Sequence, residues 1–229
     1  MDKLFSYPVY KFKVPDYEEL NKKIISKINV LKNDEKQGIV RSNKGGWHSD
    51  THDSKFPELE DIIVDLYKKE ILKTDKNIKI SSIWANINNK NASNIIHAHG
   101  SSHFSGVYYV KVPKNSGNLY FVNTHTSLTP PFNYWEDGKA DEVEYEAKEG
   151  DLYFFPGSLS HRVGKNKTDE ERISISWNVY LKDLEDMLVN NIGNLNVEKK
   201  INKKNSKSVD VFNPYKLQDK HKLNGKKND

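Results

Sequence analysis

The residues of this chain that are best suited to chemistry are histidines gathered in one short stretch. The segment HAHGSSHFSGVYYV places His97, His99 and His103 within seven residues and then continues as an apolar, strand-like run. Neither this segment nor the dozen residues before it contain Asp or Glu, although 30% of the chain is charged. Imidazoles at such positions suit a transition metal such as Fe(II), Zn(II) or Cu.

A facial metal site needs a third ligand, and the segment EGDLYFFPGSLSHRV supplies a candidate far along the chain. On a strand, His97 and His99 would point to the same face, so both imidazoles could approach one point. Gly150 and Asp151 form a turn, LYFFP is typical of an apolar strand, and PGSLS then delivers His161 at the strand's end. A single histidine is more often an ordinary polar core residue. The pair together with a distal histidine predicts metal binding.

Eleven residues after His161, the segment RISIS places Arg172 on the last expected strand, with Ser174 and Ser176 on the same face. An arginine inside a barrel is costly unless it meets an anion. Its planar fork suits a carboxylate, and a serine hydroxyl two residues on can add a hydrogen bond. Two interpretations remain open: a clamp for a small dicarboxylate that reaches to the metal, or a structural salt bridge to a barrel Asp or Glu.

The elements that must position these residues follow from the periodicity of the chain. Segments 17–34 and 56–73 repeat apolar residues at helical spacing, whereas the period changes to two from residue 77 onward. Strands are predicted at 4–14, 78–88, 104–112, 117–123, 143–149, 151–156 and 172–181, with a polar loop at 45–54 and a short closing helix at 184–192. The pattern predicts a mostly β fold, an antiparallel sandwich or jelly roll supported by N-terminal helices.

Length and composition limit the class of protein. The 229 residues suffice for one substantial core, and we expect a single domain over residues 1–196, with its strand-rich core at 78–181. The absence of cysteine excludes disulfides, thiolate catalysis and Cys-ligated metals. We find neither a signal-like apolar run at the N-terminus nor a stretch long enough to cross a membrane. We therefore expect a cytoplasmic protein without a membrane partner.

The basic charge of the chain is concentrated at its end. Residues 197–229 contain ten Lys against four Asp or Glu, which gives +6, and the net charge of +4 leaves −2 for the rest. The plain interpretation of this segment is a solvated, flexible tail. The isoelectric point of 8.9 is therefore no argument by itself that the folded part binds nucleic acid.

An H-x-H pair, a histidine about sixty residues later and an R-x-S motif on a jelly roll resemble the Fe(II)/2-oxoglutarate-dependent oxygenase superfamily. More narrowly, IWANIN, HAHGSSHFSGVYYVKVP, SGNLYF and EGDLYFFPGSLSHRVGKNKTDEERISISWNVYL resemble the 2-oxoglutarate–Fe(II) oxygenases known from marine bacteria and their phages, over residues 78–181. The resemblance implies a dioxygenase that couples decarboxylation of 2-oxoglutarate to succinate and CO₂ with oxidation of a C–H bond. It implies Fe(II) as cofactor, 2-oxoglutarate as cosubstrate and ascorbate as a stimulant; the sequence does not identify the substrate.

The resemblance also implies roles for individual residues. His161 would be the distal iron ligand, and Arg172 with Ser174 would clamp the C5 carboxylate of 2-oxoglutarate. A strand tyrosine would lie beside that carboxylate. Because Tyr108 and Tyr109 are adjacent on a strand they face opposite ways, and we predict Tyr109.

The sequence departs from the superfamily pattern at one ligand position. The usual motif is H-x-D or H-x-E, whereas residue 99 is His. If the site keeps three protein ligands, they are His97, His99 and His161. Two other arrangements stay open: two histidines with water or chloride in the third position, or His99 and His103 as the near pair with His97 orienting one of them. We expect no catalytic residue beyond the metal centre.

Further residues are candidates for the pocket wall, and other functions remain open. Trp47, His48 and the segment 130–138 could form the rim, and Trp84, Asn86 and Asn88 share a strand face. One alternative is a metal-binding cupin that does not use 2-oxoglutarate, since GDLYFFPGSLSH resembles the second cupin motif. Another is a non-catalytic binding protein whose lysine-rich tail contacts nucleic acid or a partner. The R-x-S motif favours the oxygenase, because it has no required role in a cupin.

Overall fold

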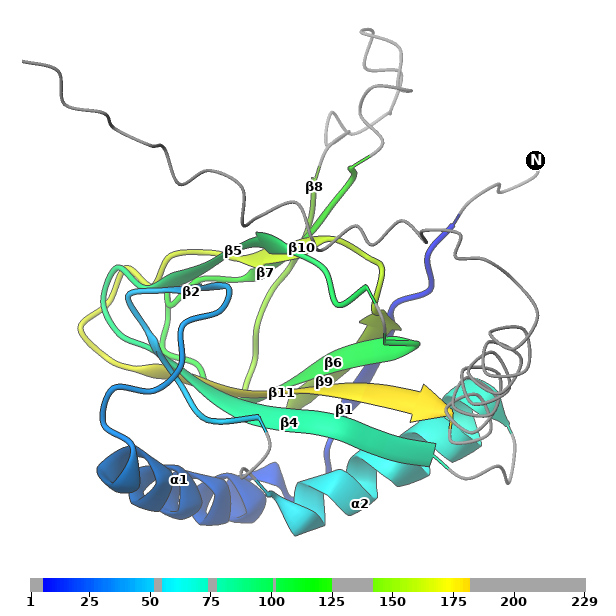
Figure 1. Cartoon of the computed structure of the whole chain (residues 1–229), viewed down its shortest axis with the longest axis horizontal. Coiled ribbons are helices and arrows are strands. Elements are labelled where there is room, and N and C mark those ends of the chain that lie inside the picture. Colours follow the sequence, from blue (N-terminus) through cyan, green and yellow to red (C-terminus); the bar gives the residue numbers. More distant parts are fainter. Residues whose placement is uncertain (1–5, 52–54, 74–77, 101, 125–141, 182–229) are drawn as a thin grey trace, which may run out of the picture. The chain divides into compact units, whose positions relative to one another are not determined.

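The computed structural model describes residues 6–51, 55–73, 78–100, 102–124 and 142–181, without the side chain of the last residue (Figure 1). The closing helix expected at 184–192, the rim segment 130–138 and the tail 197–229 lie outside these residues. Within them the fold consists of two antiparallel sheets with helices against one of them. The predicted mostly β, jelly-roll architecture is confirmed.

The larger sheet has the strand order β1-β9-β6-β11-β4-β3 and the smaller one the order β2-β5-β10-β7-β8. The described helices are α1 (Tyr17–Asp34), α2 (Pro57–Leu66) and the π-helix η1 (Tyr67–Leu72) that continues α2. The described strands are β1 (Tyr10–Lys13), β2 (Asn43–Lys44), β3 (Trp47–His48), β4 (Ile78–Asn88), β5 (Ser93–His97), β6 (Phe104–Lys111), β7 (Leu119–Val122), β8 (Glu142–Tyr145), β9 (Asp151–Pro156), β10 (His161–Val163) and β11 (Arg172–Leu181).

Strand β11 separates the core from the site by simple alternation. Its odd-numbered residues from Ile173 to Val179 are buried in the hydrophobic cluster shared with the helices. Its even-numbered residues from Arg172 to Tyr180 instead line a cavity of about 620 Å³ between the sheets. Because successive side chains on a strand point to opposite faces, one sequence supplies both an apolar wall and a polar one.

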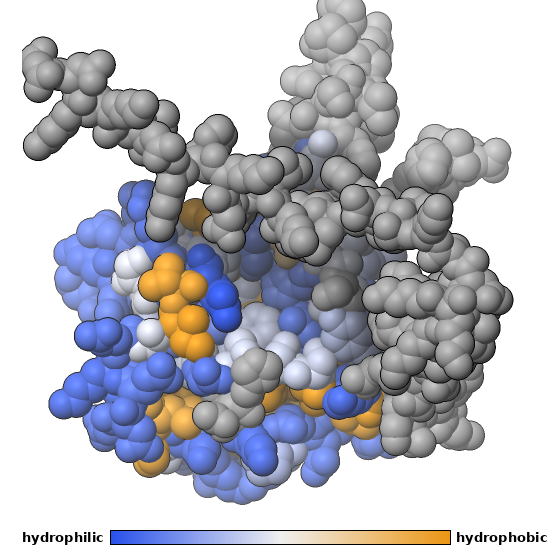
Figure 2. All heavy atoms as spheres, in the orientation of Figure 1, coloured by the Kyte–Doolittle hydropathy of each residue, from blue (hydrophilic) through white to orange (hydrophobic). Residues whose placement is uncertain are grey.

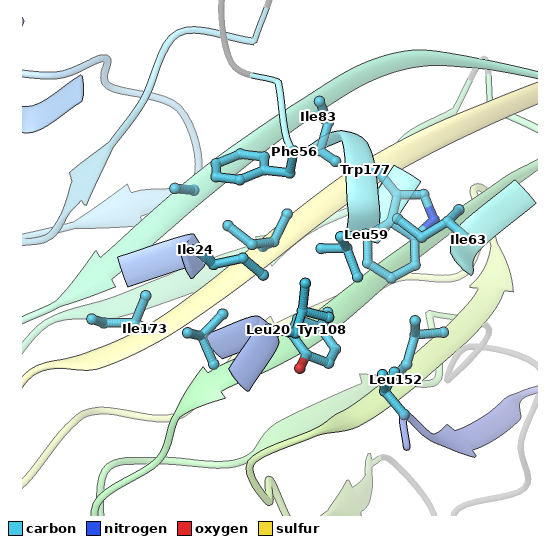
Figure 3. Close-up of a cluster of buried hydrophobic side chains, with 14 of the residues drawn as sticks. Leu20, Ile24, Phe56, Leu59, Ile63, Ile83, Tyr108, Leu152, Ile173 and Trp177 are labelled. Carbon is cyan, nitrogen blue, oxygen red and sulfur yellow. The ribbon is translucent and has the colours of Figure 1, made fainter. Parts of the chain in front are cut away.

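The helices cover the outer face of the larger sheet (Figure 1). Leu20 and Ile24 of α1 and Leu59 and Ile63 of α2 pack against the strands beneath them, as Figure 3 shows. Each fully buried aliphatic side chain contributes about 1.5–3 kcal/mol relative to an exposed one. This cluster therefore supplies much of the stability on which the cavity on the other face of the sheet depends.

Several elements differ from the sequence predictions. The helix expected at 56–73 is an α-helix that changes to a π-helix at Tyr67, and the strand expected at 143–149 ends at Tyr145. The polar loop expected at 45–54 contains β3, in which Trp47 and His48 pair with Ile87 and Asn86 of β4. His97 was expected on a strand, but the bounds of β2, β5 and β10 were not predicted, because such short strands carry too few residues to establish a period.

Gly106 of β6 illustrates how tightly the larger sheet is packed. A Cβ at this position would lie 2.3 Å from the Trp177 ring and 2.5 Å from the Tyr153 carbonyl oxygen. We expect Gly106→Ala to lower the free energy of unfolding by about 1–3 kcal/mol, the usual cost of overpacking. Gly100→Ala is the control, since a Cβ there meets no atom within 4 Å. Urea unfolding of both variants tests the prediction, and equal midpoints would contradict it.

The described surface is largely hydrophilic in the view of Figure 2, with apolar colour confined to small patches. The exposed large apolar side chains include Ile95 and Ile96 of β5. Among the described helices, none is long and apolar enough to cross a membrane.

Candidate metal centre

Two strands of the smaller sheet bring two histidines to one point. His97 is the last residue of β5 and His161 the first of β10, and the two are direct partners in the antiparallel ladder. Direct partners point their side chains to the same face of a sheet. The centroids of these imidazole rings are accordingly 4.3 Å apart.

His99 reaches the same point from a turn, not from a strand. The strand parity that the sequence predicted for His97 and His99 is therefore wrong, because β5 ends at His97. The His99 backbone N–H instead donates to the Gly157 carbonyl oxygen at 2.7 Å. A Cβ on Gly157 would lie 2.4 Å from the Ser102 carbonyl oxygen, so the glycine lets this turn dock against the loop before His161.

The three imidazoles form one cluster. One ring nitrogen from each of His97, His99 and His161 lies within 4.8 Å of those of the other two. The ring centroid of His99 lies 5.2 Å from that of His97 and 5.1 Å from that of His161. Small side-chain rotations would bring all three nitrogens to the distance of about 2.0–2.1 Å at which imidazole binds a metal.

The hydrogen bonds of the cluster fix which nitrogen faces the centre. Each Nδ1–H donates to an oxygen: His97 to the Ile95 carbonyl at 2.7 Å and His161 to the Leu159 carbonyl at 2.8 Å. His99 donates to Oδ1 of Asn178 at 2.6 Å. With the proton held on Nδ1, each Nε2 keeps its lone pair, which is the form that binds a metal.

The surroundings of all three imidazoles favour the neutral form. Burial lowers the pKa of His97 and His99, and the charge of a protonated His97 would lower that of His99 further. Burial, followed by repulsion from His97, lowers the pKa of His161 to about 3. A metal ion therefore does not have to displace protons from these rings near neutral pH.

Asn178 is the side chain that orients His99, and it is itself held at both ends. Its Oδ1 also accepts a hydrogen bond from the Ser105 hydroxyl at 2.8 Å, and its Nδ2 donates to the Ser82 hydroxyl at 3.0 Å. The three side chains come from β11, β6 and β4, which are adjacent strands. The larger sheet thereby positions His99, which lies in the turn between β5 of the smaller sheet and β6 of the larger sheet.

We expect Asn178→Leu to weaken metal binding about 10–100-fold, the usual effect of removing a partner that orients a metal-binding histidine. Ser82→Ala is the matched control, because it removes the partner of Nδ2 and leaves the bond to His99 intact. Metal titration monitored by calorimetry measures both. Equal affinity for the Asn178→Leu variant and the parent protein would show that His99 does not need this bond.

The far end of the cavity contains a buried guanidinium without a carboxylate. Arg172 is 1% exposed, and it donates to the Gly117 carbonyl at 3.1 Å and to Oδ1 of Asn88 at 2.9 Å. No described residue is a hydrogen-bond partner of its Nε, and no described Asp or Glu pairs with the guanidinium. Burial lowers the pKa of this guanidinium, which is the cost of holding a cation here. A buried cation of this kind calls for an anion.

Two further polar residues, Tyr109 and Ser174, line the same cavity as Arg172. The Tyr109 hydroxyl is buried and has no hydrogen-bond partner among the described residues. Tyr109 and Ser174 are direct partners in the ladder between β6 and β11. Burial raises the pKa of the Tyr109 phenol, so the hydroxyl stays a hydrogen-bond donor. These side chains line the same cavity as the three histidines. A molecule that binds the metal and carries a second carboxylate fits the orphaned donors.

The other sequence candidates are distributed on both sides of the sheets. Tyr108 points to the helices and donates to Oδ1 of Asn21 at 2.6 Å, which leaves Tyr109 on the cavity side. His103 is not part of the histidine cluster and packs against the Tyr180 ring. Trp47, expected at the rim, is buried in the core, whereas its neighbour His48 lines the cavity.

Sequence reasoning missed Asn178, Gly117 and the part that Asn88 plays. The alternation of RISISWN places Asn178 on the face of Arg172, so that signal was present in the sequence. The partner of Asn178 was not foreseeable, because His99 lies in a turn whose course depends on the docked loop at Gly157. Gly117 contributes a backbone oxygen, for which side-chain type gives no signal.

Comparisons with known proteins agree with this geometry. Residues 82–178 match the family model described as "Putative 2OG-Fe(II) oxygenase". That segment contains the three clustered histidines, Arg172 and Tyr109. No curated protein matches the chain.

Solved structures share the fold at low sequence identity. The chain resembles the α-ketoglutarate-dependent carbocyclase SnoK from nogalamycin biosynthesis, with 12% identity, a TM-score of 0.57, and coverage of 76% of this chain and 79% of that one. HygX from Streptomyces hygroscopicus, solved with nickel and 2-oxoglutarate, is 9% identical with a TM-score of 0.55. The match covers 76% of this chain and 82% of HygX. A Pseudomonas putida prolyl-4-hydroxylase is 14% identical with a TM-score of 0.50. The match covers 76% of this chain and 94% of the hydroxylase.

The residues that match the family model also form the strands that carry the candidate site. The matched segment runs from Ser82 in β4 to Asn178 in β11 and so includes every strand that carries a clustered histidine or the buried arginine. Over residues 82–178 the chain is therefore similar to the 2-oxoglutarate- and Fe(II)-dependent oxygenases.

Proposed function

We propose that His97, His99 and His161 hold one Fe(II) and that Arg172 binds the far carboxylate of 2-oxoglutarate in the same cavity. The observation that carries this proposal is the presence, in one cavity, of three imidazoles with clustered ring nitrogens and a buried guanidinium that pairs with no described carboxylate. Tyr109 and Ser174 would add hydrogen bonds to the same carboxylate.

The charge of such a centre differs from that of a site with a carboxylate ligand. Three neutral ligands leave the full +2 on the ion, and 2-oxoglutarate carries −2. Each would therefore favour binding of the other. Because coupling between two ligands is reciprocal, we expect the affinity for Fe(II) to rise when 2-oxoglutarate is present, and the affinity for 2-oxoglutarate to rise with the metal.

When bound, Fe(II) and 2-oxoglutarate supply an O₂-dependent oxidation of a substrate C–H bond, coupled to release of succinate and CO₂. The chain's own residues bind and orient. The acceptors of the three Nδ1–H groups hold the imidazoles in the metal-binding tautomer, and Arg172 fixes the cosubstrate's direction. Phe155 and Leu119 give the cavity apolar walls that limit the access of water near the centre.

The test of this proposal is the addition of 2-oxoglutarate to the Fe(II)-loaded protein without oxygen, followed by air. We expect a visible charge-transfer absorption on addition of 2-oxoglutarate, and formation of succinate after oxygen enters, with ascorbate sustaining turnover. A protein that takes up Fe(II) but shows neither the absorption nor succinate would contradict the proposal. That result would favour a cupin-type enzyme, and failure to take up iron would favour a binding protein.

The substrate is oxidised by hydroxylation in our proposal, since this is the simplest outcome of C–H oxidation.

The cytoplasmic location and the accessory role of residues 197–229 stay predictions from the sequence. A chain truncated after residue 196 that keeps its succinate formation would show that the tail is accessory.

A further inference from the structure

The cavity lining includes exposed residues as well as buried ones. Arg172, Ser174 and Tyr109 are buried, whereas Arg41 and Ser81, which line the same cavity, are exposed. If the proposed function holds, 2-oxoglutarate extends from the histidines toward Arg172. The exposed residues then mark the part of the lining through which a substrate enters the cavity.

His48 provides a defined polar group in the same lining, close enough to Arg41 to feel its charge. It is 3% exposed, it pairs with Asn86 across β3 and β4, and its Nδ1–H donates to the Ser49 carbonyl at 2.6 Å. The Nε2 lone pair is therefore available, and no hydrogen bond joins His48 Nε2 to another residue in the described part of the chain. Burial lowers the pKa of His48, so the ring is a neutral hydrogen-bond acceptor.

Trp84 links this acceptor to the metal centre. The indole is stacked against the His48 ring at 5.6 Å and 11°, and also against the His99 ring at 5.6 Å and 26°. The His48 ring is thus held at most two such ring spacings from a clustered histidine. A molecule of the size of an amino-acid derivative spans that distance.

The charges around the cavity favour an anion. The described residues that line the cavity include Arg41 and Arg172 but no Asp or Glu. Arg41 makes no ion pair with another described residue, and Asp50, which follows close by in the chain, does not line the cavity. Between Asp75 and Glu136 the sequence contains no acidic residue, and this segment supplies β4, β5, β6 and β7 of the cavity wall.

The sum of these charges exceeds what the cosubstrate neutralises. A divalent ion held by neutral ligands is balanced by the −2 of 2-oxoglutarate, and the guanidinium of Arg172 then remains. Arg41 adds another positive charge at an exposed position of the lining. A low-dielectric cavity with excess positive charge attracts anions and rejects cations.

We propose that the substrate is a small organic anion whose negative group pairs with Arg41 and whose N–H or O–H group donates a hydrogen bond to Nε2 of His48. This inference rests on the proposed function and names the substrate class of the same site. Arg41 and His48 would select and position the substrate, while the histidine cluster and Arg172 hold metal and cosubstrate.

The experiment uses matched pairs of probes, N-acetyl amino acids and their primary amides, which differ only in the carboxylate. The protein is first shown to give the visible absorption with Fe(II) and 2-oxoglutarate, so that failure of the proposed function is recognised separately. Each probe is then tested at saturating 2-oxoglutarate for binding by saturation-transfer NMR, with Ni(II) in place of iron, and for stimulation of CO₂ release with Fe(II).

We expect at least one acid to bind at least tenfold more tightly than its amide and to stimulate CO₂ release. Arg41→Gln should abolish that preference without changing the requirement for 2-oxoglutarate, and Arg41→Lys should restore part of it. His48→Phe should weaken binding of the acid and its amide alike, because it keeps the ring against Trp84 but removes the acceptor. Lys44→Gln is the control, since Lys44 is exposed on β2 and does not line the cavity.

Three results would overturn the inference while leaving the proposed function intact. The first is that no acid in the set of probes binds more tightly than its amide. The second is an acid preference that survives in Arg41→Gln. The third is loss of the 2-oxoglutarate absorption on addition of the acids, which would show that they displace the cosubstrate at Arg172.

Discussion

His161→Ala is expected to lose Fe(II) binding and all iron-dependent turnover of 2-oxoglutarate. The side chain is 5% exposed, its Nδ1–H is bound to the Leu159 carbonyl, and its ring lies 4.3 Å and 5.1 Å from those of the other two clustered histidines. Loss of a partner that merely orients a ligand costs about 10–100-fold in metal affinity. Loss of the ligand itself should therefore cost more than about 100-fold, which calorimetric titration with Fe(II) under argon measures.

The control must separate loss of the ligand from loss of packing. His161 contacts the rings of Phe155 and Phe121 at centroid distances of 4.7 Å and 6.4 Å, so the alanine leaves a cavity among aromatic groups. His161→Phe fills that space with an apolar ring and should fold, yet bind no iron. His103→Ala should bind iron as the parent does, because His103 is outside the cluster. A phenylalanine variant that keeps its turnover would rule out His161 as a ligand.

The second large effect is expected from Arg172→Met, which removes the cation at the far end of the cavity. A hydrogen bond to a charged group contributes about 1.5–3 kcal/mol, so the concentration of 2-oxoglutarate needed for half-maximal rate should rise about 10–150-fold. The maximal rate should change much less, because the metal ligands are untouched. Steady-state kinetics with 2-oxoglutarate as the varied substrate separates the two parameters.

Two variants make the result specific for the guanidinium. Arg172→Lys keeps the charge but not the planar fork that binds Gly117 and Asn88, and it should give an intermediate requirement. Arg162→Gln removes a guanidinium from a half-buried pair with Glu142 outside the cavity and should leave the requirement unchanged. An unchanged 2-oxoglutarate requirement in Arg172→Met would mean that the buried cation serves structure alone.

Local alternation allowed much of the site to be predicted from the sequence. Arg172 and Ser174 face the cavity because Ile173 and Ile175 are required by the core on the other side of β11. The same argument separates Tyr109 from Tyr108 only when the pairing partner is known, because both tyrosines are large enough for either face. The register of β6 against β11, which joins Tyr109 to Ser174, settles on which face each lies.

What the sequence could not predict depends on contacts between distant segments. His97 and His99 converge because a turn docks on Gly157, although the strand that was expected to align them ends too early. His48 lines the cavity because two residues of an apparently polar loop add an edge strand to β4. Neither event leaves a periodic signal, since each involves only a few residues whose partners lie far away in the chain.

The most direct test of the central claim is a crystal of the protein grown under argon with Fe(II) and 2-oxoglutarate, with diffraction recorded at the iron absorption edge. We predict one anomalous peak within bonding distance of Nε2 of His97, His99 and His161, and a cosubstrate whose far carboxylate contacts Arg172. An iron bound by other side chains, or by only two of these imidazoles, would contradict the account.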